Sequence, residues 1–461
     1  MTDDRSIDAL VIGGGFAGVA AAVTLRTRGL AVMILDDRPT LGGRARSDVL
    51  GGMAIDTGAQ LIASSFARTM ALLHDTDQAP NGGDHPGLRT APGRDLFVGG
   101  GKRHPIQFGS LRSLLGFGAL GAAEKARLGI HLVPLIARHG GVLDAAAANI
   151  PPSLDRESAR AYVERTVGAR AADALVEPAF NSFYAARGSE VSLAFYLTLG
   201  RYGSESEMLA PTHGWSELLA RALIGEGAGS AVAHETKVRV TSLVADGGQG
   251  IVAHAEDGRE WRAAGAVLAT GPRAARALLA PTVAENAPLL SWLTSVALRP
   301  TWTLALVLDA VPDRAAFGIL RHPAEAHTVA ACAVHGAKLS AGAPAGMDAV
   351  LAWPTPAAAA RLHGHPAQEI VAAMMPEVED LVPSVRGHVA HVRLYRVDAG
   401  TPLVRPGFAA DRVRGRALAA ALPLPIALAG DYLTTPTLEG AVASGMEGAE
   451  RLARTLRASK E

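Results

Sequence analysis

The sequence contains a single cysteine, Cys332, and its aromatic residues make up only 5% of the chain. One cysteine forms neither an internal disulfide nor a cysteine-ligated metal cluster, so we expect a protein of the reducing cytoplasm. Lysine and arginine (44) balance aspartate and glutamate (44), which argues against nucleic acid as a partner. His363 and His365 are the nearest approach to a metal motif, and we predict no bound metal.

No uncharged apolar run reaches the roughly 18 residues that a membrane-spanning helix needs. The nearest candidates are residues 108–120 and 128–137, inside a stretch, 105–148, that we expect to be largely helical. Such helices fit either a buried pair or a contact with the inner face of a membrane, and the sequence leaves both open. With 461 residues and 49% apolar composition, the chain has material for two or three domains.

The clearest motif lies at the start of the chain. An apolar strand at residues 9–12 leads into a turn with GxGxxG spacing, which is followed by a helical pattern. Glycines at these places allow a sharp turn, a close approach of the backbone to a pyrophosphate, and tight helix–strand packing. The helix N-terminus adds N–H groups and a positive dipole end. The contacts predicted for a dinucleotide are Gly13, Gly15, Phe16, Ala17 and Gly18.

A second short strand, residues 31–36, ends on Asp36, which is followed by Asp37. A carboxylate at this distance from the glycine turn can accept hydrogen bonds from the ribose of an adenosine. We therefore assign Asp36 and Asp37 to the cofactor site. These features alone do not distinguish FAD from NAD.

Two further turns follow, and a matching segment lies at the other end of the chain. Leu41-Gly42-Gly43-Arg44 comes shortly after the acid, and Asp56-Thr57-Gly58-Ala59-Gln60 comes next. Near the C-terminus, residues 428–432 (LAGDY) precede residues 438–445 (LEGAVASG). An arginine beside two glycines suits a phosphate, and a helix N-terminus suits the negative charge of a reduced flavin.

These motifs resemble the flavin amine oxidase superfamily, and their wording is closest to its branch of phytoene desaturases, squalene-associated desaturases and protoporphyrinogen oxidases. The resemblance implies FAD, which we expect to be bound non-covalently. It also implies further cofactor contacts at Gly43, Arg44, Gly58, Ala59, Gln60, Val238, Gly430, Asp431, Glu439, Gly440, Ala441 and Val442.

The fold class implied is α/β, with a glutathione-reductase-like Rossmann domain for FAD interleaved with an α+β substrate domain. We expect residues 1–75, 205–275 and 420–461 in the FAD-binding domain. Residues 76–204 and 276–419 would then form the substrate-binding domain.

The sequence specifies the catalysed reaction less fully than it specifies the cofactor and the fold. Amine oxidases of the superfamily usually carry a lysine on a strand that corresponds to residues 300–308, but this segment has none, and the nearest lysines are Lys237 and Lys338. We therefore predict dehydrogenation or desaturation of a small lipophilic substrate, such as an isoprenoid, by hydride transfer to flavin N5. Dioxygen or a quinone would reoxidise the flavin.

Three alternatives stay open: an amine or amino-acid oxidase, a redox-neutral flavin isomerase, and a flavin-binding protein without turnover. The catalytic residues are not identified, and whether the chain forms a homodimer is left open. Local clusters of aromatic residues nominate four side chains for the substrate pocket: Tyr184, Phe195, Trp302 and Tyr395.

Overall fold

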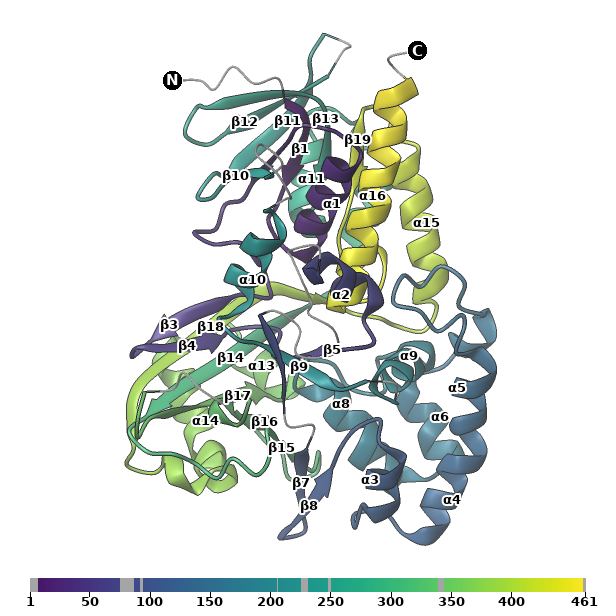
Figure 1. The fold of residues 1–461 in the computed structure, drawn as a ribbon. Coiled ribbons are helices and arrows are strands. Elements are labelled where there is room, and N and C mark those ends of the chain that lie inside the picture. Colours follow the sequence, from purple (N-terminus) through teal and green to yellow (C-terminus); the bar gives the residue numbers. More distant parts are fainter. Residues whose placement is uncertain are drawn as a thin grey trace.

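The structure is a computed structural model that describes residues 7–74, 87–91, 94–204, 206–224, 231–247, 250–338 and 344–458. Two large sheets organise these residues, one above the other in the view of Figure 1. β1 (Ile7–Ile12) and α16 (Leu438–Ala458), which hold the first and last described residues, both lie in the upper part of this view (Figure 1).

The upper sheet joins strands from the start, the middle and the end of the chain. Its order is β10-β2-β1-β13-β12-β11, and β19 pairs with β13. The strands are β1 (Ile7–Ile12), β2 (Val32–Leu35), β10 (Ala233–Glu235), β11 (Val240–Ala245), β12 (Ile251–Ala255), β13 (Glu260–Leu268) and β19 (Ile426–Leu428). β1 runs parallel to both β2 and β13. Together with α1 (Phe16–Thr27), these strands form the predicted Rossmann-type βαβ unit.

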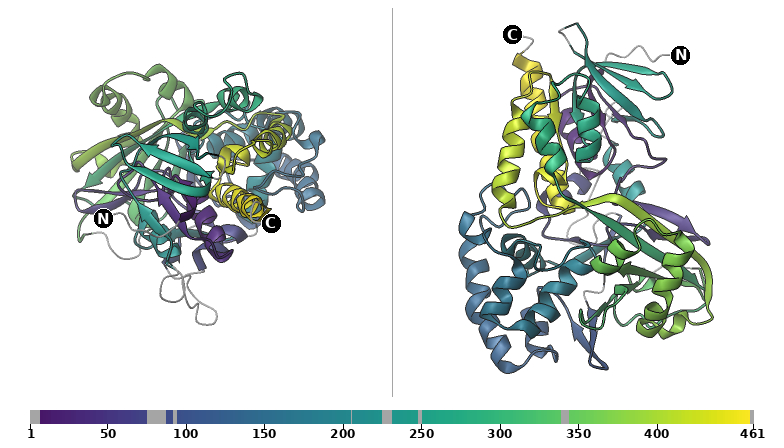
Figure 2. Two further views of the ribbon diagram at one scale, coloured as in Figure 1. Left: turned by 90° about the horizontal axis from the view of Figure 1, so that it is seen from above. Right: turned by 180° about the vertical axis from the view of Figure 1, so that it is seen from behind.

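The last helix, α16 (Leu438–Ala458), packs directly against α1 (Figures 1 and 2). A Cβ added at Gly445 would lie 2.1 Å from the Ala17 carbonyl oxygen, so only glycine permits this approach. The two ends of the sequence are thus held together by helix packing.

The lower sheet has the order β18-β14-β17-β16-β15-β7-β8. Its strands are β7 (Asp95–Gly99), β8 (Lys102–Ile106), β14 (Leu298–Leu308), β15 (Gly318–Arg321), β16 (Val329–Val334), β17 (Asp348–Pro354) and β18 (Val389–Pro402). One face packs against α14 (Ala367–Leu381), and α13 (Pro356–Arg361) lies near it. The other face joins a core that includes Ala305, Val307 and a group of helices.

That helical group lies beside the lower sheet (Figure 2). It comprises α3 (Leu111–Gly116), α4 (Ala122–His131), α5 (Val133–His139), α6 (Ala159–Thr166), α7 (Ala169–Ala171), η2 (Ala172–Val176), α8 (Glu177–Asn181) and α9 (Leu193–Ser204). The helical segment expected at 105–148 is therefore three short helices, and β8 takes its first residues. Within the described residues no helix is long and apolar enough to cross a membrane.

Shorter elements complete the described structure. Those before residue 230 are β3 (Ser47–Leu50), β4 (Met53–Asp56), β5 (Ile62–Ala63), α2 (Ala67–His74), β6 (Leu88–Thr90), η1 (Pro152–Leu154), β9 (Met208–Pro211) and α10 (Trp215–Ala222). Those after it are α11 (Pro272–Leu279), α12 (Pro288–Ser295), η3 (His335–Ala337), η4 (Pro383–Val385), α15 (Phe408–Ala420) and η5 (Asp431–Leu433). The α/β fold class is confirmed, whereas the exact domain boundaries stay a prediction.

Candidate functional site

In the glycine turn between β1 and α1, Gly13 and Gly18 have no room for a side chain, whereas Gly15 has. A Cβ at Gly13, whose φ is +107°, would lie 2.7 Å from the Ala269 oxygen, and one at Gly18 would lie 1.8 Å from the Gly13 oxygen. A Cβ at Gly15 meets nothing closer than 3.8 Å. The turn therefore leaves room at Gly15, next to the N-terminus of α1, where Phe16 and Ala17 begin the helix. This is the geometry that a pyrophosphate requires.

The acid at the end of β2 faces this turn. Asp36 is buried, and its carboxylate accepts hydrogen bonds from the backbone N–H groups of Gly14 (2.5 Å) and Arg38 (2.7 Å). Burial raises the pKa of Asp36, although these two hydrogen bonds act against the change. Val238 is buried and its N–H donates to the Asp36 carbonyl oxygen at 2.9 Å. Asp37 is exposed and lies near Arg38 and Arg239.

Arg44 connects the two ends of the chain. Its guanidinium donates to Asp431 Oδ1 at 2.6 Å and to the Gly400 carbonyl oxygen at 2.6 Å. Burial acts to lower the pKa of Arg44, but the charge of Asp431 outweighs it and the pKa is raised. The side chain nevertheless keeps 43% of its surface accessible. Gly43, with φ +58°, lies against Gly15, and Gly430, with φ +149°, precedes Asp431.

The N-terminus of α16 lies next to α2, and this contact decides the place of Glu439. The Glu439 carboxylate is buried and accepts from the N–H groups of Arg68 (3.1 Å) and Thr69 (2.9 Å), so it caps α2. Only the backbone of Glu439 is therefore free to face a cofactor. Gly440 has no room for a side chain, Val442 is buried, and Ala441 is partly buried.

The turn after β4 lies against Arg44. A Cβ at Gly58 would lie 1.7 Å from the Arg44 carbonyl oxygen. Ala59 accepts a hydrogen bond from Trp215 Nε1 at 2.7 Å, and Gln60 is buried. Lys338 is completely buried and reaches this turn. Thr303, on β14, donates to the Thr57 carbonyl oxygen at 3.0 Å.

The four aromatic candidates for the substrate pocket separate into three places. Tyr184 and Phe195 are neighbours, with ring centroids 5.3 Å apart, and Phe180 and Tyr196 complete the cluster. Burial raises the pKa of Tyr184, and the charge of Asp431 raises it further, so this cluster lies near the C-terminal motif.

The other two candidates lie elsewhere. Trp302 is buried on the face of β14 that packs under α14, opposite to the face of Thr303. Its side chain thus belongs to the core and does not face the turn at Gly58. The Tyr395 hydroxyl donates to Asp48 Oδ2 at 3.1 Å, at the partly exposed edge formed by β18 and β3.

Thr270 was missed at the sequence level. It follows β13 beside Gly13, and its buried hydroxyl has no partner among the described residues. The signal was the Ala269-Thr270-Gly271 turn after an apolar strand, which places a hydroxyl at the end of β13 next to the glycine turn. Lys338 gave no such signal, because no recognisable motif surrounds it.

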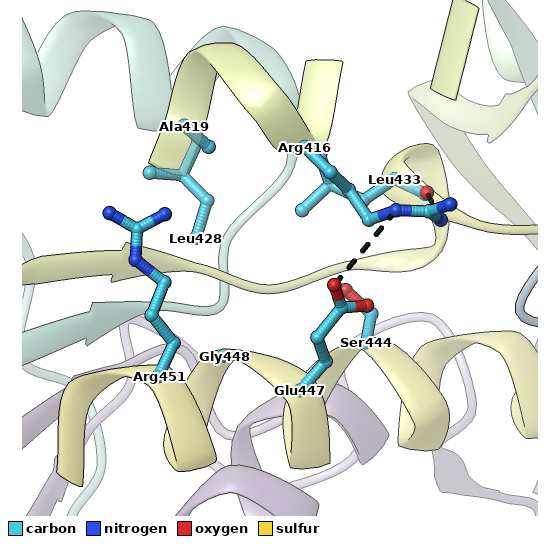
Figure 3. Close-up of a pocket in the computed structure, with 8 residues that line it drawn as sticks. All are labelled: Arg416, Ala419, Leu428, Leu433, Ser444, Glu447, Gly448 and Arg451. Carbon is cyan, nitrogen blue, oxygen red and sulfur yellow. Dashed lines mark hydrogen bonds and ion pairs between the residues drawn. The ribbon is translucent and has the colours of Figure 1, made fainter. Parts of the chain in front are cut away.

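Two pockets that are partly open to solvent were also found. A cavity of about 30 Å³ between α15 and α16 is lined by Arg416, Glu447 and Arg451 (Figure 3) and holds little more than a water or two. A second cavity of about 210 Å³ lies between the β7–β8 hairpin and η2. Among the described residues, no three His, Cys, Asp or Glu side chains converge as metal ligands would.

Comparison with known proteins identifies the family. The model for flavin-containing amine oxidoreductases matches residues 16–453. In sequence, the chain is similar to polyamine oxidase 2 of Arabidopsis thaliana, with 46% identity over 55 residues, which are 12% of this chain and 11% of that protein. The matches with the first curated relatives span about a tenth of those relatives' length.

Two solved structures share the whole fold. A proposed protoporphyrinogen oxidase from Exiguobacterium sp. 255-15 has a TM-score of 0.73 at 18% identity, over 98% of this chain and 99% of that one. A fatty acid isomerase from P. acnes, which produces CLA, has a TM-score of 0.68 at 14% identity, over 97% and 98%. The glycine turn, Asp36 and the Arg44–Asp431 pair also fit FAD. The chain belongs to the flavin-containing amine oxidoreductase family, and its cofactor is FAD.

Proposed function

We propose that this FAD-dependent oxidoreductase dehydrogenates or desaturates a small lipophilic substrate. FAD, which Asp36, Arg44 and Asp431 would hold, would supply a hydride acceptor, and we propose dioxygen or a quinone as the final electron acceptor. The protein's part is to hold the cofactor, to orient the substrate and to exclude water. The contacts of Asp36, Arg44 and Asp431 support the first of these tasks.

The aromatic cluster next to Asp431 carries the proposal. Phe180, Tyr184, Phe195 and Tyr196 lie within ring contact of one another, with centroids 5.3–6.1 Å apart. Tyr184 is close enough to Asp431 for its pKa to respond to that charge. Phe180 and Phe195 are buried in the core, whereas Tyr184 and Tyr196 are partly exposed. Tyr184 is therefore the ring that we propose to contact a flat apolar or polyene substrate.

The strand β14 supports the same assignment. Its residue in contact with the cofactor turn is Thr303, whose hydroxyl donates to Thr57. Amine oxidases of the superfamily usually carry a lysine on this strand. Thr303 has a hydroxyl and no amino group, so it cannot hold a proton near the substrate as a lysine would. Hydride removal from carbon makes little demand for such a group, because the cofactor supplies the difficult step.

The exposed apolar residues of the segment 108–138 support a lipophilic substrate that comes from a membrane surface. Five large apolar side chains of this segment are exposed by 37–65% of their surface: Phe108, Leu111, Leu115, Ile130 and Val133. Arg112, Lys125, Arg127 and Arg138 lie in the same segment, whereas its one acid, Glu124, is paired with Arg170. Exposed apolar groups with an excess of basic residues suit the surface of an anionic bilayer.

Oxidation of an amine is a second candidate. The local sequence matches to polyamine oxidases favour it, and putrescine oxidase shares the fold at 15% identity. Such a reaction would oxidise the amine to an imine, whose hydrolysis by water gives an aldehyde or ketone and releases ammonia or an amine, and it would reduce the same flavin. Anaerobic reduction of the flavin by lipophilic compounds or by amines distinguishes the two candidate reactions.

The test is an anaerobic titration of the FAD-loaded protein, followed by flavin absorbance. One panel contains lipophilic polyenes and terpenoids, and the other contains primary and secondary amines. Bleaching by the first panel alone supports the proposal, and bleaching by amines alone overturns it. Conversion of an unsaturated lipid without net bleaching would indicate a redox-neutral isomerase. Tyr184→Leu should raise the KM for a substrate of the first panel, whereas Trp302→Leu, on the far face of β14, should not.

A further inference from the structure

The turn of residues 56–60 is anchored by side chains at every carbonyl group. Gln60 Nε2 donates to the carbonyl oxygens of Asp56 (2.7 Å) and Gly58 (2.9 Å). The carbonyls of Thr57, Ala59 and Gln60 accept from three other residues, which are Thr303 (3.0 Å), Trp215 (2.7 Å) and Lys338 (3.2 Å). These donors come from β14 of the lower sheet, from α10 and from the residue after η3, so three separate parts of the chain hold this one turn.

Anchored carbonyls fix the direction of the opposite N–H groups. In a trans peptide the C=O and the N–H point in opposite directions, and all peptides of the described residues are trans. The N–H groups of Gly58, Ala59 and Gln60 therefore point away from Thr303, from Gln60 Nε2 and from Trp215. Among the described residues, no acceptor faces these three N–H groups. They are donors directed away from the core of the turn, beside Arg44.

Lys338 is central to this anchoring. Its side chain has no exposed surface, and its ammonium donates to Asp56 Oδ2 (2.5 Å), to Gln60 Oε1 (3.0 Å) and to the Gln60 carbonyl oxygen (3.2 Å). All three ammonium hydrogens thus have acceptors. The bond to Gln60 Oε1 also orients the amide so that Nε2 faces the two carbonyls that it holds.

Three other polar groups face the same cluster. Ser47 donates to Asp56 Oδ1 at 2.5 Å and Arg89 adds a positive charge near Asp56. His335 Nε2 contacts the Ala54 carbonyl oxygen at 2.9 Å, and burial lowers its pKa to about 3, so the ring is neutral. A fully buried lysine is costly to maintain in any fold. Neutralising Asp56 does not require the two further bonds to Gln60, which act only on the turn.

We propose that Lys338 is a positioning residue for the flavin: it holds the 56–60 turn so that the N–H groups of Gly58 to Gln60 are presented to the cofactor ring. This rests on the assignment of the turn to the FAD site. Donors held in place before the reaction stabilise the negative charge of a reduced flavin without rearrangement. Lys338 acts through Gln60 and does not itself touch the substrate.

The decisive variant is the double substitution Asp56→Asn with Lys338→Met in the FAD-loaded full chain. It removes both charges together, so no uncompensated buried charge remains and much of the stability lost in Lys338→Met alone should return. The anchor on Gln60 is still lost. We expect the Kd for FAD to rise about tenfold, the flavin midpoint potential to fall, and the visible flavin spectrum to change.

Thr303→Val provides a second, uncharged test of the same turn, because it removes only the donor to Thr57. It should change the flavin spectrum and potential in the same direction, and it decides the question if the double variant does not fold. The matched control is Arg321→Met with Glu377→Gln, a partly buried pair between β15 and α14 that touches none of the turn. This control should lower stability and leave the potential unchanged.

A double variant whose Kd, spectrum and potential equal those of the wild type would overturn the proposal, since Lys338 would then only neutralise Asp56. Equal shifts in the Arg321/Glu377 control would overturn it as well, because they would show a general effect of stability. If the wild-type chain bound no FAD, the assigned cofactor site itself would fail, which is a distinguishable result.

Discussion

Replacing Gly15 by valine should separate folding from cofactor binding. The backbone at Gly15 is extended, with φ −78° and ψ −178°, which suits a β-branched residue. The nearest atoms to an added Cβ are the Gly42 oxygen at 3.8 Å and Gly43 Cα at 4.0 Å. The protein without cofactor should therefore lose only about 1 kcal/mol of unfolding free energy or less.

The cost to FAD is larger, because the new side chain occupies the space through which the pyrophosphate approaches the backbone. Losing two hydrogen bonds from backbone N–H groups to phosphate costs about 3–6 kcal/mol, at about 1.5–3 kcal/mol for each charged bond. This corresponds to a Kd for FAD raised by about 10²–10⁴-fold. Flavin absorbance or fluorescence titration measures the Kd, and urea unfolding of the cofactor-free protein measures stability.

Gly18→Ala is the comparison variant on the same turn. Its Cβ would lie 1.8 Å from the Gly13 oxygen, so the backbone must move, at a cost of about 1–3 kcal/mol or more even without cofactor. Gly15→Val that purifies with a full complement of FAD would refute the assignment of the phosphate site. Equal destabilisation of the two cofactor-free variants would refute the reasoning from open space.

Three further predictions concern pH, the core and the surface. The pKa of His335 is lowered from 6.5 in an ordinary environment to about 3, so the unfolded chain binds the proton first and stability falls as pH falls from about 6.5 towards 3. The unfolding free energy of wild type minus that of His335→Gln should therefore be smaller at pH 5 than at pH 7, and a constant difference would contradict this. Trp302→Leu should lower the unfolding free energy by about 2–4 kcal/mol with the Kd for FAD unchanged, since the ring packs in the core under α14; a large change in Kd with intact stability would show that the ring serves the site. Co-sedimentation with vesicles that contain anionic lipid should be lost in the triple variant Leu111→Ser, Leu115→Ser and Ile130→Ser and retained in Val49→Ser, which alters an exposed apolar residue on β3.

The local sequence was sufficient to predict those features of the site that depend on the backbone of a single turn. GxGxxG spacing after an apolar strand predicted the β1–α1 turn, and Asp36 was placed correctly at the end of β2, because strand length and glycine conformation are local properties. The strand at 300–308 was also predicted, and it is the greater part of β14. The meeting of the two ends could be inferred only because both motifs belong to one cofactor, and the Arg44–Asp431 contact at 2.6 Å is its structural counterpart.

Tertiary structure decided what the long side chains do. An alternating strand does not reveal which of its faces meets the site, so Trp302 was nominated although Thr303 is the residue that faces the turn. Glu439 begins a helix as expected, but its carboxylate caps α2, a helix far away in the sequence. Lys338 carried no local signal, because its role arises from burial against Asp56 and Gln60, which lie 282 and 278 residues earlier. A buried charge is identified by the partners that surround it, and only the folded chain brings those partners together.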